Sequence, residues 1–255
     1  MKSKCFVSDY AYFYDSIYQD KDYKKEVDFL EKIFKKFLKK KPKNILDLGC
    51  GTGNHILELS KRGYKTSGVD ISPDMIKIAQ EKFKKLNLRG DFYIKDIACY
   101  RPRKKFDVII SMFAVINYII EIKALLRLFK NVYSVLKKDG LFIFEIWNAF
   151  KAQNSLLPTS FKEIELDNKN KLIREGRIKT YRLSQICRID YVLKLYNEEK
   201  IIKHYKENHI LRFYYPQEIR NYLSFSNLKL INIYPSFRFG KIKDEDFHIL
   251  YVAKK

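Results

Sequence analysis

One short segment, 45–54, limits the fold of this chain more than any other feature. An apolar run passes directly into three glycines at alternate positions, Gly49, Gly51 and Gly53. Such glycines lack the β-carbons that would keep a ligand away from the backbone, and they accept backbone angles that other residues avoid. The pattern predicts a buried strand that turns tightly into a helix and offers its backbone to a ligand.

An acidic residue at the end of the next predicted strand narrows the kind of ligand. The apolar stretch 65–69 ends at Asp70, and an acid at the tip of a neighbouring parallel strand can accept hydrogen bonds from ribose hydroxyls. The dinucleotide fingerprint G-x-G-x-x-G needs its third glycine where this chain has Asn54. A nucleotide-like ligand other than a dinucleotide is therefore indicated.

From residue 44 to residue 146 the chain alternates between apolar runs and amphipathic stretches. An amphipathic helix at 24–40, which Pro42 ends, precedes them, and Ser72-Pro73 marks the start of a later helix. Continuous apolar strands that alternate with helices imply a parallel sheet covered on both faces. We predict strands at 44–48, 65–70, 91–95, 106–111 and 141–146, and helices at 54–62, 73–86 and 122–137.

After Trp147 the pattern changes to alternation at period two. Residues 159–213 predict three or four antiparallel strands, with turn signals at 167–170 and 197–200. A helix from Pro216 to about residue 224 follows, and strands at 228–234 and 247–252 complete the chain.

The composition limits the partners that we expect. The chain has 255 residues and a net charge of +21, but the excess is spread along its length and consists mostly of lysine. A surface that binds phosphate backbones tends to concentrate charge and to use arginine forks, so we do not expect nucleic acid as partner. A basic field also attracts small anionic substrates.

No targeting, membrane or metal signal stands out in the sequence. The first residues have no apolar core typical of a signal peptide, and the longest apolar stretch, 108–120, is too short to span a bilayer. The four cysteines are scattered and have no metal-binding or disulfide spacing. We therefore expect a cytoplasmic protein without a metal.

The glycine segment together with Asp70 resembles motif I of the class I S-adenosylmethionine (SAM)-dependent methyltransferases. The resemblance implies an α/β fold, doubly wound and Rossmann-like, whose seven-stranded sheet closes with an antiparallel hairpin. It further implies a single domain, 1–255, in four segments. These are an N-terminal lid and helix at 1–41, a SAM-binding core at 42–150, an antiparallel β insertion at 151–215 that covers the substrate, and a C-terminal helix and hairpin at 216–255.

Other segments are similar to those of small-molecule methyltransferases. Residues 111–118, Ser-Met-Phe-Ala-Val-Ile-Asn-Tyr, have no proline and so lack the D/N/S-P-P-Y/F motif that clamps a flat base. They look like the corresponding region of enzymes that N-methylate nucleotide-linked amino sugars. Residues 13–23 resemble the lid of that group, and the insertion that ends in 209–216 is also similar.

The resemblance implies a set of cofactor-binding residues at the carboxyl ends of the strands. In the family pattern Asp70 holds the ribose hydroxyls, Asp96 accepts from the adenine amino group, and Tyr14 and Tyr23 close over SAM. The small Cys50 fits the loop without acting as a nucleophile. The expected cofactor-binding residues are Tyr14, Tyr23, Asp47, Gly49, Cys50, Gly51, Gly53, Asp70, Ile71, Met75, Asp96, Ile97 and Met112.

The acceptor side is predicted from fewer signals. Tyr118 stands where the sugar enzymes often have histidine, and it is expected near the acceptor, as is Trp147 at the end of a strand. His204 and His209 are the remaining candidates for a base. Their odd spacing puts them on opposite faces of a regular strand, and His204 shares its face with Arg212. We expect Tyr14, Tyr118 and His204 as catalytic residues and Tyr118, Trp147 and Arg212 as substrate contacts.

The predicted reaction is methyl transfer from SAM, with S-adenosylhomocysteine as product, to the nitrogen or oxygen of a small anionic metabolite. A nucleotide-linked amino sugar fits the resemblance best. O-methylation of a phosphorylated or phosphoramidate precursor of a surface polysaccharide is the alternative. An RNA or protein methyltransferase and a non-catalytic subunit are weaker hypotheses, and we expect a monomer or a homodimer.

Overall fold

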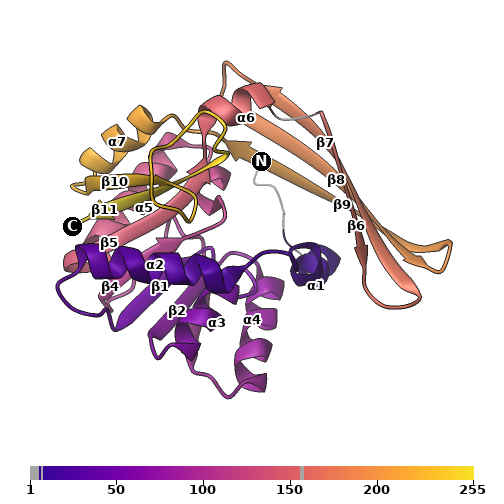
Figure 1. Cartoon of the computed structure of the whole chain (residues 1–255), viewed down its shortest axis with the longest axis horizontal. Helices are drawn as coiled ribbons and strands as arrows, with labels where there is room; N and C mark the ends of the chain where they lie inside the picture. The colour runs from indigo at the N-terminus through magenta and orange to yellow at the C-terminus, as the bar shows by residue number, and fades with distance from the viewer. Residues whose placement is uncertain (1–5, 7, 156–157) are drawn as a thin grey trace.

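Two sheets form the framework of the chain in its computed structural model, which describes Phe6, residues 8–155 and residues 158–255 (Figure 1). The N-terminal stretch 1–5, on which the expected lack of a leader rests, lies outside the described residues. The strands of the larger sheet are β1 (Asn44–Leu48), β2 (Lys65–Asp70), β3 (Gly90–Ile94), β4 (Phe106–Ser111), β5 (Leu136–Trp147), β10 (Lys229–Pro235) and β11 (His248–Lys254).

The larger sheet has the order β10-β11-β5-β4-β1-β2-β3. Strands β1 to β5 run parallel to one another, whereas β11 pairs antiparallel with both β5 and β10. The predicted doubly wound, seven-stranded sheet with a closing antiparallel hairpin is therefore confirmed.

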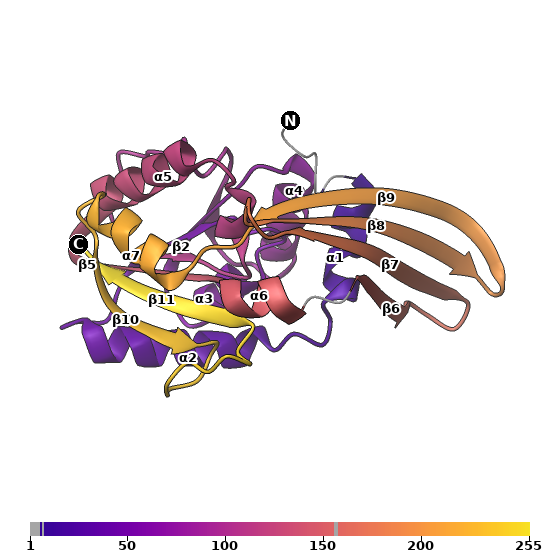
Figure 2. The ribbon, with the colours of Figure 1, turned by 90° about the horizontal axis from the view of Figure 1, so that it is seen from above.

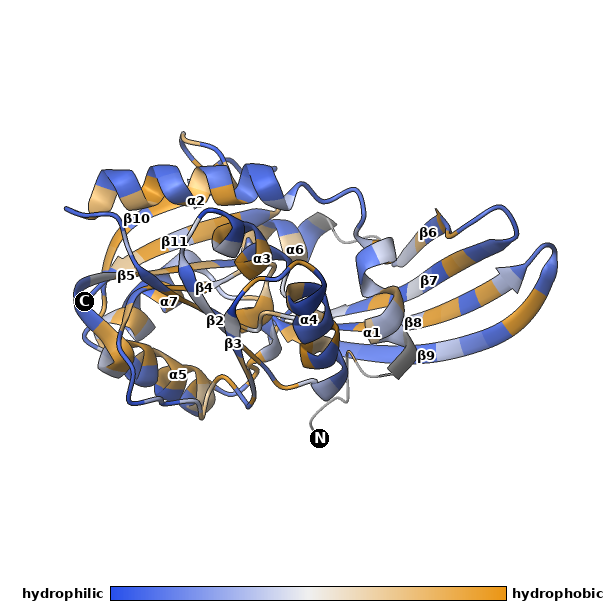
Figure 3. Ribbon diagram, turned by 90° about the horizontal axis from the view of Figure 1, so that it is seen from below, coloured by the Kyte–Doolittle hydropathy of each residue, from blue (hydrophilic) through white to orange (hydrophobic). Residues whose placement is uncertain are grey.

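Helices cover both faces of this sheet because its strands are apolar on both sides. One face carries α2 (Tyr23–Phe37), α3 (Asn54–Lys61) and α4 (Pro73–Lys85), and the other carries α5 (Ile122–Val135) and α7 (Pro216–Ser224). Along β5, Leu141 and Ile143 pack with α2, whereas Phe142 and Phe144 pack with α5 and α7. Figure 3 shows the alternation of apolar and hydrophilic residues along α2 that this packing requires.

Side chains cap the starts of two helices, and one of these caps, Ser72, was predicted. Asp22 accepts a hydrogen bond from Lys25 N at 2.9 Å, so α2 begins at Tyr23 and ends at Phe37, a few residues before the predicted end. The Ser72 hydroxyl accepts from Met75 N at 3.3 Å, with Pro73 in the first turn of α4. The structure has two further helices for which the sequence pattern predicts no bounds, α1 (Ser8–Ile17) and α6 (Ala149–Ser155).

The predicted antiparallel block is a four-stranded sheet of consecutive hairpins. It consists of β6 (Thr159–Glu165), β7 (Asn170–Tyr181), β8 (Ile186–Asn197) and β9 (Lys200–Arg212). Asp167 forms the first turn, because its Oδ1 accepts from the backbone of Lys169 and of Asn170, both at 2.9 Å. Figure 2 shows this sheet curving away from the larger one.

Helix α1 connects the two sheets. Its Tyr10, Phe13 and Ile17 pack against Leu172 and Leu193 of the four-stranded sheet. In Figure 1 the helix lies between that sheet and α4. The inner end of the four-stranded sheet and α1 therefore both stand over the carboxyl ends of the parallel strands.

Candidate active site

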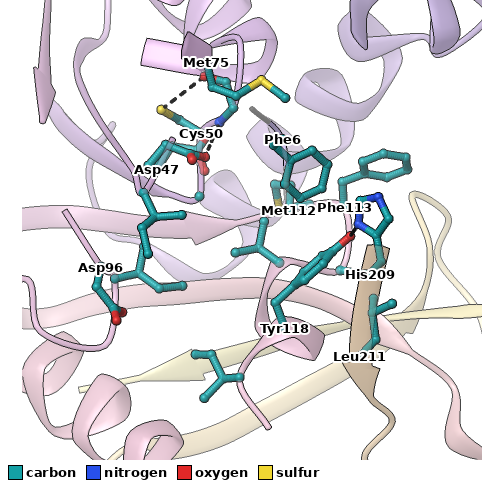
Figure 4. Close-up of a pocket in the computed structure, with 18 of the residues that line it drawn as sticks. Phe6, Asp47, Cys50, Met75, Asp96, Met112, Phe113, Tyr118, His209 and Leu211 are labelled. Carbon is teal, nitrogen blue, oxygen red and sulfur yellow. Dashed lines mark hydrogen bonds between the residues drawn. The ribbon is translucent and has the colours of Figure 1, made fainter. Parts of the chain in front are cut away.

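A cavity of about 520 Å³ lies at the carboxyl ends of the parallel strands (Figure 4). Open α/β sheets bind their ligands at this edge, and the volume suits a small organic ligand. We call one part the sheet half; it is lined by Asp47, Gly49, Cys50, Gly51, Asp70, Ile71, Met75, Asp96, Ile97 and Met112. We call the other part the aromatic half; it is lined by Phe6, Tyr10, Tyr14, Tyr18, Tyr118, Tyr191 and His209.

The glycine loop opens its backbone to the sheet half, as predicted. Gly51 has a φ of +53°, and a Cβ placed on it would meet no protein atom within 4 Å. The space next to this backbone is thus large enough for a ligand atom. Gly53 differs from the prediction: it does not line the cavity but starts α3 with a φ of +81°, where a Cβ would lie 3.0 Å from Ala79 Cβ.

Asp70 is held with both carboxylate oxygens facing backbone donors. Its Oδ2 accepts from Gly51 N at 2.8 Å and its Oδ1 from Ser72 N at 2.9 Å. Burial raises the pKa of this carboxyl above its ordinary value, although the two backbone hydrogen bonds oppose the shift. Each oxygen keeps acceptor capacity for a ligand, so the group can bind two neighbouring hydroxyls.

Asp47 lies deeper, under the glycine loop. Its side chain is 1% exposed, and its Oδ1 has no hydrogen-bonding partner among the described residues. Burial raises the pKa of Asp47 to about 7. A cationic ligand group, such as an ammonium, would supply the missing partner and favour the ionised carboxylate. The sheet half therefore offers complementary groups to a ligand with an ammonium and a ribose.

The other predicted contacts of the sheet half lie where the sequence places them. Asp96 follows β3 and lines the cavity, and its Oδ1 accepts from Ala98 N at 2.9 Å. Ile71 is 56% exposed although it is apolar, which fits a residue that a flat ring covers. The lining also contains Met75, Ile97 and Met112.

Cys50 lines the cavity as a small, inert residue. Burial raises the pKa of its thiol well above the ordinary value, so the thiol stays protonated. Its Sγ donates to Gly51 O at 3.7 Å. The structure thus gives Cys50 no feature of a nucleophile.

A polar cluster fastens α1 to the glycine loop. Asp15 of α1 accepts from Thr52 Oγ1 at 2.7 Å and from Asn54 Nδ2 at 2.9 Å, and its other oxygen lies 2.5 Å from Lys82 Nζ. Burial alone would raise the pKa of Asp15, but the hydrogen bond from Lys82 and the positive charge of Lys82 lower it below its ordinary value. The cluster places the neighbouring Tyr14 over the cavity.

Tyr14 and Tyr23, the two tyrosines expected to close over SAM, both line the cavity. Burial raises the pKa of each phenol above its ordinary value. Both side chains therefore stay protonated near neutral pH, and each can donate a hydrogen bond but cannot act as a base.

In the aromatic half, Tyr118 is paired with a histidine of the four-stranded sheet. Tyr118 Oη lies 2.9 Å from His209 Nδ1 (Figure 4). His209 is 2% exposed, and burial together with the charge of Arg174 lowers its pKa to about 4. The imidazole is thus neutral at pH 7.

A half-buried arginine, Arg174, lies next to the tyrosines of the aromatic half. Arg174 of β7 donates to Tyr18 Oη at 3.1 Å, and its guanidinium lies 4.6 Å from the ring centroid of Tyr191. Its Nε is buried without a partner, and no carboxylate of the described residues lies within 4.0 Å of it. The aromatic half therefore carries positive charge that the described residues do not neutralise by an ion pair.

Two predicted acceptor residues lie outside this cavity, and the prediction is corrected for both. His204 is exposed on β9, on the face opposite to His209. Arg212 shares that face and is used within the fold, because it bonds Gln185 Oε1 at 2.9 Å and lies 3.6 Å from Glu218. Alternation shows which residues share a face but not which face meets the cavity. Trp147 does line it.

Sequence reasoning missed Arg174, Tyr191 and Phe6. Arg174 and Tyr191 lie on adjacent strands of the predicted antiparallel block, but Phe6 belongs to a distant segment. Once the pairing of β7 with β8 is known, Arg174 stands opposite Leu193 and Tyr191 stands opposite Gly176, two residues along, so the register brings the two side chains close together.

Neither a metal cluster nor a spanning helix is found in the part of the chain that the structure describes. No group of three or more histidine, cysteine, aspartate or glutamate side chains there could hold a metal ion. None of its helices is long and apolar enough to cross a membrane.

Comparison with known proteins gives matches across the sheet core and across the whole fold. A family profile described as a methyltransferase domain matches residues 45–140. A solved SAM-dependent methyltransferase from Clostridium acetobutylicum superposes with a TM-score of 0.80 and 27% identity, covering 96% of this chain and 97% of that one. A sugar N-methyltransferase from Streptoalloteichus shares the fold, with a TM-score of 0.79, 16% identity and coverage of 96% and 92%.

The curated relatives align with a smaller part of this chain than the solved structures do. Malonyl-[acyl-carrier protein] O-methyltransferase 2 of Ilyobacter polytropus is 30% identical over 79% of this chain and 73% of its own length. A dTDP-3-amino-3,4,6-trideoxy-α-D-glucopyranose N,N-dimethyltransferase of Streptomyces venezuelae is 26% identical over 54% and 57%. The alignments with two putative methyltransferases, one from Geobacillus and one from Bacillus subtilis, cover only 64% and 50% of those relatives' own lengths.

Proposed function

This chain belongs to the class I SAM-dependent methyltransferases, and on that premise we propose that it methylates a small anionic acceptor held in the aromatic half. Our best candidate is a nucleotide-linked amino sugar, methylated on its nitrogen. We also propose a cytoplasmic monomer or homodimer that needs no metal.

The sheet half would hold SAM through groups already in place. The orphaned Asp47 would pair with the ammonium, Asp70 would accept from the ribose hydroxyls and Asp96 from the adenine amino group. When bound, SAM supplies a methyl group on a sulfonium, so the leaving group needs no activation by the protein. The contribution of the chain is then alignment of the reactants and exclusion of water.

The neutral side chains of the aromatic half favour an acceptor that attacks without help from a strong base. Tyr14 stays protonated, and His209 stays neutral at pH 7. An unprotonated amine has a lone pair ready for in-line attack at the methyl carbon, whereas an alcohol needs a base in reach. These side chains would orient an amine as α1 covers the site.

The observation that carries the anionic part of the proposal is Arg174. This arginine is half-buried, its Nε is fully buried without a partner, and it forms no ion pair with the described residues, so a ligand that neutralises it would be favourable; arginine also matches the oxygens of a phosphate. The phosphate groups of a sugar nucleotide would neutralise Arg174 if the side chains of Tyr10 and Tyr18, which now accept hydrogen bonds from it, turned aside.

The amino-sugar part rests on similarity. The S. venezuelae relative is named for an amino-sugar nucleotide, and a sugar N-methyltransferase shares the fold over nearly the whole chain. A second candidate is O-methylation of an anionic oxygen, a carboxylate or a phosphate. The relation to a malonyl O-methyltransferase favours it, and an ionised oxygen likewise needs no base.

The proposal is tested by incubating the chain and SAM with dTDP-3-amino-3,4,6-trideoxy-α-D-glucopyranose and measuring product mass. We expect a gain of one or two methyl groups. Arg174→Gln should raise the acceptor KM roughly tenfold to a hundredfold, since a charge-assisted hydrogen bond contributes about 1.5–3 kcal/mol.

The matched control is Arg188→Gln, because Arg188 is exposed on β8 and pairs with Asp190. It should leave KM unchanged. Methylation of malonyl thioesters or sugar phosphates but not of the amino sugar would favour the second candidate. Methylation of RNA alone would refute both.

A further inference from the structure

His209 carries a buried polar atom that neither the fold nor the proposed cofactor site uses. The side chain is 2% exposed and lines the aromatic half. Its Nδ1 is paired with Tyr118 Oη at 2.9 Å, but its Nε2 has no partner among the described residues. Buried polar atoms are paired in the great majority of cases, so an unpaired one at the wall of a cavity points to a ligand.

The orientation of the imidazole is set before any ligand arrives. The rings of Phe6, Tyr10 and Tyr191 surround it, with centroids 5.0, 5.6 and 5.3 Å away. These contacts and the bond to Tyr118 hold the ring without occupying Nε2. A polar atom that is pre-positioned in this way loses little freedom when it binds a partner.

The chemistry of a neutral imidazole limits what that partner can be. Burial and the charge of Arg174 keep the pKa of His209 at about 4, so one ring nitrogen carries a proton and the other a lone pair. Tyr118 can donate to Nδ1 or accept from it, and Nε2 then has the complementary role. A hydroxyl can match Nε2 in either state, whereas a phosphate only accepts and an ammonium only donates.

We infer that Nε2 of His209 binds a hydroxyl of the acceptor and thereby selects hydroxylated acceptors, with Tyr118 as the residue that positions the imidazole. The inference rests on the proposed function, since it requires the acceptor to lie in the aromatic half. Arg174 would bind the anionic part of the acceptor and His209 its uncharged part. The substrate class is therefore a hydroxylated amine joined to an anionic group.

Three variants separate this role from a structural one. His209→Asn keeps an amide that can bond Tyr118 in place of Nδ1 but removes Nε2. His209→Gln places an amide near the position of Nε2. His204→Asn is the matched control, because His204 is exposed on the same strand and outside the cavity.

The test compares an amino-sugar nucleotide that has hydroxyls on both carbons next to the amine with its two singly deoxygenated counterparts. For the unsubstituted chain, loss of one of these hydroxyls should lower kcat/KM roughly fivefold to tenfold, the effect of one neutral hydrogen bond. His209→Asn should lower kcat/KM for the full acceptor by the same factor and remove the discrimination. His209→Gln should restore part of it, and His204→Asn should change nothing.

Discrimination that survives in His209→Asn, or an equal loss for all three acceptors, would overturn the inference. SAM affinity, measured by calorimetry, should be the same in every variant. If SAM binds but no amino sugar is methylated, the acceptor class of the proposed function fails instead.

In that case, a measurement that needs no acceptor substrate can still show whether Nε2 of His209 is free to bind a ligand. In the ¹⁵N spectrum of the chain saturated with S-adenosylhomocysteine, the Nε2 signal is identified by its loss in His209→Asn. We expect a neutral ring whose Nε2, protonated or not, makes no hydrogen bond within the protein. An Nε2 that donates to or accepts from a protein group in this state would overturn the inference.

Discussion

Replacement of Asp70 with asparagine should weaken SAM binding by about two orders of magnitude. Each carboxylate oxygen already accepts one backbone N–H, from Gly51 at 2.8 Å and from Ser72 at 2.9 Å. An asparagine amide must turn its NH₂ group toward one of these donors, so it loses that bond and one acceptor for the ribose. A bond to a charged acceptor contributes about 1.5–3 kcal/mol, and a loss near 3 kcal/mol corresponds to roughly a hundredfold in Kd.

The assay is calorimetric titration of SAM into Asp70→Asn and into Asp91→Asn. Asp91 belongs to the neighbouring strand β3 but is half exposed and pairs with Lys104 at the surface, so its variant should bind SAM normally. Thermal melting of both variants without ligand checks that they fold. An unchanged SAM affinity in a folded Asp70→Asn variant would refute the assignment of the ribose site.

Three further predictions concern pH, the lid and nucleic acid. Burial raises the pKa of Asp47 to about 7, so the folded chain holds this proton more tightly than the unfolded chain does, and the free energy of unfolding falls as the pH rises from about 4 to 7. Asp47→Asn should flatten that fall in urea titrations at several pH values, and an unaltered profile would contradict the shift. Asp15→Asn breaks the pair with Lys82, so release of S-adenosylhomocysteine in stopped flow should become several-fold faster, and an unchanged rate would show that α1 does not limit release. Binding to an RNA oligonucleotide at low salt should be weak despite the net charge of +21, whereas tight binding that falls steeply with salt would indicate a nucleic-acid surface.

The sheet core could be predicted because the interactions that define its strands and helix starts involve residues close together in the sequence. Strands that bury both faces are mostly apolar, so β1, β4 and the buried part of β5 at 141–146 stand out in the sequence, whereas the exposed start of β5 does not. Caps such as Ser72 mark helix starts through contacts three residues away. The carboxyl ends of parallel strands meet at one edge, so Asp47, Asp70 and Asp96 could be expected in one cavity, where the structure has them.

The aromatic half was less predictable because it depends on contacts between distant segments. Period-two alternation showed that His204 and His209 face opposite sides of β9, but only the docking of the sheet over the cavity decides which side is inside. Arg174 had no local pattern to distinguish it from the many other basic residues. Its partial burial results from Tyr10 and Tyr18 of the N-terminal segment, which lie over β7 and accept hydrogen bonds from its guanidinium.

The division between the two halves reflects the chemistry that each must perform. The sheet half would hold a ligand common to a large family through the glycine loop and strand-end acids, which have recognisable spacing. The aromatic half would recognise one acceptor among many, and its residues come from α1, the segment after β4 and the four-stranded sheet. Fold similarity therefore informs the first far more than the second.

The most direct test of the account is calorimetric titration of the unsubstituted chain with S-adenosylhomocysteine and, separately, with NAD. The glycine loop, the unpaired Asp47 and the strand-end Asp70 predict saturable one-to-one binding of S-adenosylhomocysteine and no heat of binding with NAD. Binding of NAD, or no binding of S-adenosylhomocysteine by the folded chain, would contradict the central claim.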